Sequence, residues 1–258
     1  MKIPILLYHA LFHKTIRKEK YALSGEDFER QMHYLAENGF QSLSLDDFWR
    51  SQNHTEPDRK GVVITFDDGN LSDYSIAFPI LKKYGFTATF FVTVNWIGTE
   101  NYVTWLHLKV MVSENMSIQS HSLSHSFLSD INPRDLYKEL SESKNLLEGN
   151  LNIPVTYLSL PGGFCSKKVF RMAKDLTYRG VCTSMPGLNT LNSQTREFVI
   201  LNRFLITRET SLNHFKAIID KDRKYIASQK THYYCKLGMK KILGSKRYYK
   251  IWSTFFRE

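Results

Sequence analysis

The sequence predicts an α/β fold in which about seven or eight parallel strands, each followed by a helix, form a barrel. Short apolar segments alternate with helix-like segments along most of the chain, as in repeated βα units. The chain has 258 residues and is 42% hydrophobic, which is enough for one large core of the usual barrel size. In the run from Val62 to Phe66, three β-branched apolar residues and an aromatic one surround a single Thr, as expected for a strand buried on both faces of a parallel sheet.

Eight segments have the composition of strands in this barrel. They are residues 3–8, 41–45, 62–66, 87–92, 117–120, 156–160, 179–183 and 198–206. The sequence contains no internal repeat and no low-complexity linker. We therefore expect one barrel domain over residues 1–219, followed by a tail over residues 220–258.

Helix boundaries can be placed from capping residues and prolines. Ser24 can form a capping box with Asp27, and Gly39 can end the helix that follows. Pro133 is expected to open another helix. Pro79 would interrupt a helix in its interior, so we place it in a first turn, where its missing N–H costs nothing.

Two short motifs carry the candidate chemistry. Asp67 and Asp68 follow the buried strand directly, and His121 and His125 lie farther along the chain. Each motif has a plainer interpretation, because Asp-Asp-Gly is common in turns and paired histidines occur on surfaces. Together, however, one Asp and two His supply three protein ligands and leave positions open for water and substrate, as in catalytic zinc sites. Successive residues leaving a strand point in opposite directions, so one carboxylate can bind the metal while its neighbour faces the reacting water.

The two motifs resemble those of the polysaccharide deacetylases, the NodB-homology group also called carbohydrate esterase family four. Thr-Phe-Asp-Asp-Gly stands at residues 65–69 and His-Ser-Leu-Ser-His at residues 121–125. The likeness continues through residues 21–28, 85–91 and 160–163, and covers about residues 3 to 215. The resemblance implies a distorted (β/α)7-8 barrel of the NodB-homology type. It also implies Asp67 as general base and Asp68, His121 and His125 as ligands of a divalent metal, with zinc as the expected ion.

The chain departs from this family in two places. Members usually carry an Arg before the Pro loop that tethers the base, whereas this chain has Tyr-Leu-Ser-Leu-Pro at residues 157–161. Members also usually end on a Leu-x-x-His strand that supplies the general acid, and here that pattern occurs only as Leu-Leu-Tyr-His at residues 6–9. Because a closed barrel has no privileged first strand, His9 can fill this role, as in the permuted deacetylases that act on poly-N-acetylglucosamine, which this arrangement resembles. The alternative is a strand-end histidine bonded to a backbone carbonyl.

Three further site predictions follow. Arg203 is a candidate replacement for the missing tether, since a guanidinium can hold a carboxylate bidentately; the alternative is a surface Arg paired with an acid such as Glu209. A backbone N–H in the loop Pro161, Gly162 and Gly163 can stabilise the oxyanion, although turn formation explains the loop almost as well. Trp105 can stack on a sugar face, although a single Trp before a helix is more often part of the core.

Charge and cysteine content set the expected surroundings. Of the net charge of +10, the tail over residues 220–258 holds most, with eleven Lys or Arg against three Asp or Glu. These cations alternate with aromatic residues, which suits peripheral contact with an anionic membrane surface or, equally, a terminal helix packed on the barrel. Nucleic acid is not an expected partner, because no recognition motif accompanies the charge. The three cysteines form no CxxC pair, no run of 18 apolar residues occurs, and the first nine residues have the pattern of a strand, so we expect a cytoplasmic protein.

The predicted function is therefore metal-assisted hydrolysis of an N-acetyl group on a sugar of a glycan or glycan precursor. A bound metal lowers the pKa of its water toward about 7, Asp67 takes the proton, and His9 protonates the leaving amine. Two alternatives remain open at this point. One is a hydrolase of the same fold that acts on a non-glycan amide or cyclic imide, and the other is a non-catalytic relative that only binds glycans. Neither the sugar nor its carrier follows from the sequence.

Overall fold

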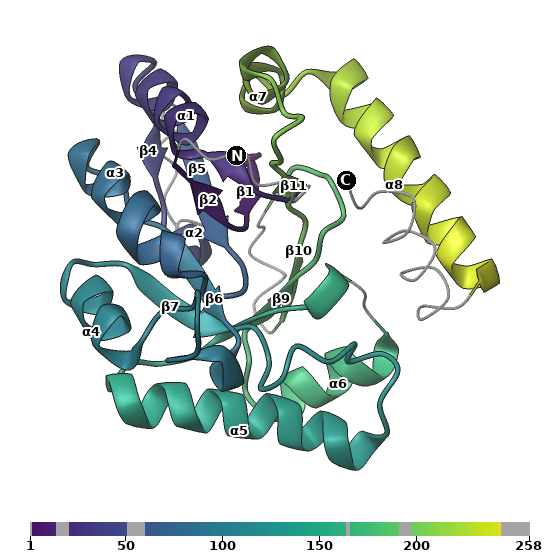
Figure 1. Ribbon diagram of the computed structural model, residues 1–258. Helices are drawn as coiled ribbons and strands as arrows, with labels where there is room; N and C mark the ends of the chain where they lie inside the picture. Colours follow the sequence, from purple (N-terminus) through teal and green to yellow (C-terminus); the bar gives the residue numbers. More distant parts are fainter. Residues whose placement is uncertain (1, 14–20, 51–59, 164–165, 191–197, 244–258) are drawn as a thin grey trace.

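Parallel strands pair side by side in a sheet that curls into a partly closed barrel, with most of the helices outside it (Figure 1). The structure is a computed structural model and describes residues 2–13, 21–50, 60–163, 166–190 and 198–243. The main strands are β1 (Ile5–Tyr8), β4 (Gln41–Ser42), β5 (Gly61–Phe66), β6 (Thr89–Val92), β7 (Ser117–Ser120), β8 (Tyr157–Ser159), β9 (Gly180–Cys182), β10 (Val199–Leu201) and β11 (Phe204–Leu205). The predicted α/β class with a parallel, barrel-like sheet is confirmed.

The order of the strands places the N-terminal strand inside the sheet. The order is β10-β9-β8-β7-β6-β5-β1-β11, with β4 beside the start of β5, and these neighbours pair in parallel. β1 therefore lies between β5 and β11, with Leu6 opposite both Ile64 and Phe204. This register brings the residue after β1 next to the residues that follow β5.

Most of the helices cover the outside of the sheet (Figure 1), whereas residues 45–50 pack Leu45 and Phe48 into the cluster on its inner face. The helices are α1 (Gly25–Glu37), α2 (Leu45–Arg50), α3 (Phe78–Lys83), α4 (Trp105–Ser113), α5 (Pro133–Leu151), α6 (Lys167–Asp175), α7 (Leu212–Ile219) and α8 (Arg223–Leu243), with short 3-10 helices η3 (Val94–Trp96) and η4 (Pro161–Gly163). The predicted caps are present. The Ser24 hydroxyl accepts the Asp27 N–H at 3.0 Å, and Gly39 has a φ of +71° just after α1.

Three details differ from the sequence prediction. The expected strand 198–206 is two strands, β10 and β11, at opposite ends of the strand order, because Asn202 and Arg203 carry the chain from one edge of the sheet to the other. The expected strand 41–45 stops early because Leu45 begins α2. A small pair, β2 (Leu11–Phe12) and β3 (Leu23–Ser24), was not predicted, since two residues are too few for a pattern.

Pro79 lies in the first turn of α3, but the backbone is already helical before it. A π-helix, η2 (Asp73–Ala77), leads directly into α3. The wider π-turn lies where the proline ring and missing N–H would disturb a regular α-helix.

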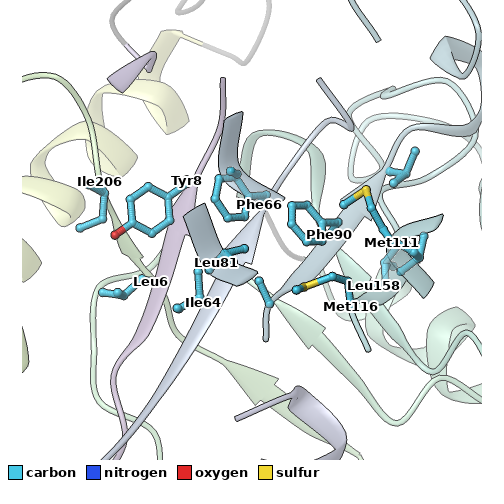
Figure 2. Close-up of a cluster of buried hydrophobic side chains, with 14 of the residues drawn as sticks. Leu6, Tyr8, Ile64, Phe66, Leu81, Phe90, Met111, Met116, Leu158 and Ile206 are labelled. Carbon is cyan, nitrogen blue, oxygen red and sulfur yellow. The ribbon is translucent and has the colours of Figure 1, made fainter. Parts of the chain in front are cut away.

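The core divides into two layers because strand side chains alternate between faces. On one face the rings of Tyr8, Phe66 and Phe90 stack in a row across β1, β5 and β6, with centroid distances of 5.2 and 4.9 Å (Figure 2). The other face carries a second buried cluster that includes Val63 and Phe91. Because adjacent side chains point to opposite faces, Asp67 points away from the Phe66 side of the sheet. It lies on the same side as Val63, the inner side of the curled sheet.

The C-terminal helix α8 contacts α7 and the barrel. Its residue Ile226 is buried in the main core, and the Tyr234 hydroxyl lies 3.5 Å from the Met185 sulfur. The part of the tail that the structure describes thus packs on the protein. None of the described helices is long and apolar enough to span a membrane.

Candidate active site

Asp68, His121 and His125 form a compact cluster at the carboxyl ends of β5 and β7. The Asp68 Oδ1 atom lies 3.3 Å from His121 Nε2 and 3.4 Å from His125 Nε2. Candidate ligand atoms from all three residues lie within 4.8 Å of one another. One carboxylate and two imidazoles around a small space are a suitable donor set for Zn²⁺ with positions left for water, so these residues fit the metal that the sequence predicts.

The backbone of this cluster adopts conformations that residues with a Cβ rarely take. Asp68, Ser122 and His125 have φ values of 83°, 68° and 62°. Such angles persist only where surrounding contacts hold them, and they occur often at functional sites. The strain here falls on two of the three candidate metal ligands.

Burial and the facing imidazoles shift the pKa of the Asp68 carboxyl in opposite directions. Burial alone would raise the pKa of its carboxyl, but the facing imidazoles of His121 and His125 hold that pKa well below its ordinary value. Asp68 is therefore a carboxylate, the form that binds metal.

Ser159 on β8 connects the two halves of the site. Its carbonyl oxygen lies 3.0 Å from His121 Nδ1, so a proton on Nδ1 leaves the Nε2 lone pair facing Asp68. Its hydroxyl donates to Asp67 Oδ2 at 2.8 Å. Ser159 was not predicted from the sequence, because a serine before the Pro loop carries no distinctive pattern.

Glu139 of α5 holds the loop between the two histidines. Its carboxylate oxygen Oε2 accepts hydrogen bonds from the N–H groups of Leu123 at 3.0 Å and Ser124 at 2.9 Å. The Ser124 hydroxyl donates to Oε1. Glu139 is only 8% exposed. Glu139 was not predicted from the sequence either. A usable signal was its place beside Leu140 on the buried face of a helix, where an acid is unusual unless it has partners.

Arg203 holds Asp67 in a bidentate ion pair. The guanidinium Nη1 and Nη2 atoms donate to Oδ1 and Oδ2 of Asp67 at 2.7 and 2.8 Å, and Nε donates to the Thr183 carbonyl at 3.0 Å. Arg203 is 0% exposed, which excludes the alternative of a surface pair with Glu209. The structure thus brings Arg203 to the position for which the sequence analysis proposed it.

The ion pair keeps Asp67 charged. Burial would raise the pKa of Asp67, but the charges of Arg203 and His121 outweigh it and lower the pKa below its ordinary value. A carboxylate offers about four acceptor positions. The hydrogen bonds from Arg203 and Ser159 use one position on Oδ1 and two on Oδ2. Oδ1 keeps a position that can accept a proton from water.

His9 comes from the end of β1 and faces the same cavity as the carboxylates. It lines this cavity together with Asp67, Asp68, His121 and His125. Its buried Nδ1 makes no hydrogen bond to any described residue, so Nδ1 does not show the backbone carbonyl contact of the alternative interpretation. Burial lowers the pKa of His9, and the nearby carboxylates of Asp68 and Asp67 only partly offset this.

The cavity has a volume of about 300 Å³. Besides the five residues already named, its walls are formed by Tyr21, Phe127, Leu160, Gly162, Gly163, Ser184, Leu205, Tyr233, Lys236 and Leu237. Its walls therefore combine aromatic and apolar side chains with a few polar groups, as ligand sites commonly do.

The predicted oxyanion loop is only partly suited to its role. Pro161 is buried, has no N–H and does not line the cavity, and the Gly163 N–H donates to the Leu160 carbonyl at 2.7 Å. The N–H of Gly162 is the remaining candidate donor. Gly163 has a φ of +70°, and a Cβ there would lie 2.2 Å from Ser184 Oγ, so this position requires glycine.

The structure does not bring Trp105 to the cavity. Trp105 begins α4 and is partly buried against the main core, as in the plainer interpretation. A different tryptophan lies at the metal-ligand cluster, since Trp96 stacks on His125 with a ring-centroid distance of 4.9 Å.

Comparisons with known proteins agree with this geometry. A family model described as polysaccharide deacetylase matches residues 54–181. A Bacillus subtilis protein described as a polysaccharide deacetylase, YxkH, is 31% identical over 222 residues, which cover 85% of this chain and 76% of that protein. A poly-beta-1,6-N-acetyl-D-glucosamine N-deacetylase of Staphylococcus epidermidis is 30% identical over 101 residues, which cover 39% of this chain and 35% of the relative.

Solved structures show the same similarity. The Streptococcus pyogenes deacetylase PplD, in complex with acetate, superposes with a TM-score of 0.77 at 27% identity, covering 85% of this chain and 98% of that one. A Bacillus anthracis protein described as a polysaccharide deacetylase, BA0330, superposes with a TM-score of 0.74 at 31% identity, covering 85% of this chain and 69% of that one.

Proposed function

This chain belongs to the polysaccharide deacetylase family, and we propose that it removes the N-acetyl group from a sugar of a cell-surface glycan or glycan precursor through the site around Asp67. One observation carries the proposal. A buried carboxylate, held by Arg203, lies beside the cluster of Asp68, His121 and His125, and His9 faces the same cavity. A base, a set of metal ligands and an acid are the parts that hydrolysis of an amide requires.

We assign the metal site to Asp68, His121 and His125, with zinc as the proposed ion. When bound, such an ion supplies Lewis acidity and lowers the pKa of water. The protein's own groups perform the remaining steps. Asp67 Oδ1 accepts the proton of the attacking water, and Arg203 and Ser159 fix the orientation of that carboxylate.

The leaving group needs a proton, and His9 is the proposed donor. Cleavage of the C–N bond releases acetate and an amino sugar, and the nitrogen must be protonated as the bond breaks. Because burial lowers the pKa of His9, its protonated form is a stronger acid than an exposed imidazolium. The Gly162 N–H is proposed to face the carbonyl oxygen, where negative charge develops.

The first substrate class to test is a glycan of N-acetylglucosamine. Staphylococcal relatives named as poly-beta-1,6-N-acetyl-D-glucosamine N-deacetylases support this choice. For the tail, peripheral membrane contact is a separate proposal, supported by its basic and aromatic composition over residues 220–258.

The test is acetate release from N-acetylglucosamine oligomers by the purified protein with added zinc. We expect release that stops with a chelator and with Asp67→Asn. A panel of small amides and cyclic imides tests the alternative substrate class. Sugar binding without acetate release in the metal-loaded protein would instead indicate the non-catalytic alternative.

A further inference from the structure

The segment from Thr93 to Trp96 contacts all three candidate metal ligands. The Thr93 N–H donates to the Asp68 carbonyl at 3.3 Å, and the Thr93 hydroxyl donates to the His121 carbonyl at 3.4 Å. The Trp96 ring stacks on His125, with an angle of 28° between the ring planes. One short stretch after β6 therefore supports the backbone of two ligands and the side chain of the third.

The two candidate histidine ligands are held in different ways. His121 Nδ1 lies 3.0 Å from the Ser159 carbonyl oxygen, and a hydrogen bond of this kind fixes the orientation of a ligand ring. Among the described residues, only Asp68 has a polar contact with the His125 ring, and the His125 side chain is 28% exposed. Two rings contact it, His121 edge-on and Trp96 in a stacked arrangement. The face of Trp96 is thus the surface that can keep the His125 ring from turning.

The backbone that carries Trp96 is itself bonded to the loop between the two histidines. The Val94 N–H donates to the Ser122 carbonyl at 3.3 Å. The Asn95 N–H donates to the Leu123 carbonyl at 2.9 Å. These bonds fix η3 relative to the loop that ends in the second histidine, so the indole is held in place independently of the ring on which it stacks.

We propose that Trp96 is a positioning residue of the metal site, whose indole holds the His125 imidazole with Nε2 toward Asp68. This inference rests on the metal site of the proposed function and adds a residue outside both sequence motifs that sets metal affinity. Aromatic pairs favour stacked or edge-on geometries over others, so the indole restricts the orientations of the imidazole. A ligand ring that is already oriented loses less freedom when it binds. Trp96 thus does for His125 what the Ser159 carbonyl does for His121.

The test measures zinc affinity by competition with a chelator in variants of two tryptophans. Trp96→Leu and Trp96→Gln remove the flat ring, and each should weaken zinc binding by about tenfold, as is usual when a group that orients a metal ligand is lost. Trp96→Phe keeps a flat ring and should recover most of the affinity. Trp105→Leu is the matched control and should bind zinc like the wild-type protein, because Trp105 packs on the main core and does not line the cavity.

Two further measurements separate positioning from a general effect on stability. Urea unfolding of the metal-depleted variants shows how much stability each has lost. The absorption spectrum of bound Co²⁺ reports the arrangement of its ligands, and it should change in Trp96→Leu but not in Trp105→Leu, whichever variant is less stable. Wild-type zinc affinity in both non-aromatic variants of Trp96, or a loss in Trp96→Phe as large as theirs, overturns the inference.

Zinc binding and acetate release, measured on the same samples, separate this inference from the proposed function. If the wild-type protein binds zinc in a Trp96-dependent manner but releases no acetate from N-acetylglucosamine oligomers, the positioning role stands and the hydrolase assignment to these sugars fails. If acetate is released and zinc affinity does not depend on Trp96, the hydrolase stands and the positioning role fails.

Discussion

At the scale of single residues, the site depends on charges that are buried in pairs. Asp67 and Arg203 are 3% and 0% exposed and make two hydrogen bonds to each other. Removing one partner of such a pair leaves an uncompensated buried charge, which commonly costs about 3–5 kcal/mol. The pair is thus a structural unit, and the proposed role of Asp67 as base would make it a functional one.

Arg203→Ala should lower stability by about 3–5 kcal/mol and reduce turnover, while metal content stays the same. Burial raises the pKa of Asp67, and without Arg203 the carboxyl loses the largest contribution that lowers it, so its pKa rises. Because a general base loses activity as pH falls through its pKa, the acidic limb of the pH–rate profile should move to higher pH. Arg203→Lys keeps a positive charge without the planar guanidinium. Its stability and its acidic limb should therefore lie between those of the wild-type protein and of Arg203→Ala. Urea unfolding and pH–rate profiles measure these effects.

The matched control for this experiment is Arg179→Ala. Arg179 pairs with Asp46 at 2.8 Å but is 46% exposed, so its loss should cost less than about 1 kcal/mol. An unchanged acidic limb in both Arg203 variants would mean that Arg203 does not set the pKa of Asp67.

Glu139→Gln should weaken metal binding by about 10- to 100-fold, the usual effect of removing a group that orients metal ligands. The reason is that Glu139 fixes the N–H groups of Leu123 and Ser124 between the two histidines. Competition with a chelator measures zinc affinity. Glu142→Gln, an exposed acid one turn later on α5, should keep wild-type affinity. Equal affinities in the two variants would make Glu139 a purely structural residue.

His9→Gln should lower turnover by about 10²- to 10⁴-fold, the usual contribution of a general acid, without loss of bound metal. His33→Gln serves as its control, because His33 is exposed on α1 and pairs with Glu37. Turnover near the wild-type value in His9→Gln would exclude the assigned role.

The sequence was sufficient for residues whose roles follow from local motifs and insufficient for those that depend on packing. Asp67, Asp68, His121 and His125 belong to two short motifs, and the structure places them together. Glu139 and Ser159 were missed, because their partners are loop N–H groups and side chains that no spacing connects to them. Trp105 was a candidate on residue type alone. Residue type does not indicate whether a side chain at the start of a helix faces the cavity or the core.

At the scale of elements, β1 is a central strand although it comes first in the chain. Its neighbours are β5 and β11, and Leu6 is 0% exposed in the main core. The sequence predicted this strand and, from its terminal His9, its place near the site. It did not predict that residues 198–206 divide into two strands, because an apolar segment looks the same whether it stays at one edge or crosses to another.

Leu6→Ala should lower the free energy of unfolding by about 2–5 kcal/mol, as for other large apolar residues in a packed core. Ile200→Ala on β10 is the matched comparison, since Ile200 is 49% exposed and its truncation should cost about 0.5 kcal/mol. Urea denaturation of both variants provides the measurement. Similar small losses would place β1 outside the cooperative core.

At the scale of the whole molecule, the proposed metal joins parts of the chain that are far apart in sequence. Asp68 follows β5, whereas His121 and His125 follow β7. An ion that binds only the folded protein stabilises it by about 2.7 kcal/mol when present at 100 times its Kd. The site should therefore couple to the stability of the barrel.

Zinc should raise the melting temperature of the metal-depleted protein, and a chelator should reverse the increase. His121→Ala removes one ligand and should abolish the response, whereas His33→Ala should retain it. Thermal unfolding followed by circular dichroism measures the shift. A response that persists in His121→Ala would mean that the stabilising ion binds elsewhere.

The chain crosses from β10 to β11 at Asn202 and Arg203, and this crossing affects how the protein folds. The strands that these two residues join lie at opposite ends of the sheet order, so Arg203 reaches Asp67, 136 residues earlier in the chain, only when both edges have taken their places. Contacts between residues so distant in sequence form late, after the entropy of closing the chain has been lost. We therefore expect catalytic competence to be acquired late in folding, because a chain whose final strands are not yet in place leaves Asp67, the proposed base, without the contact to Arg203.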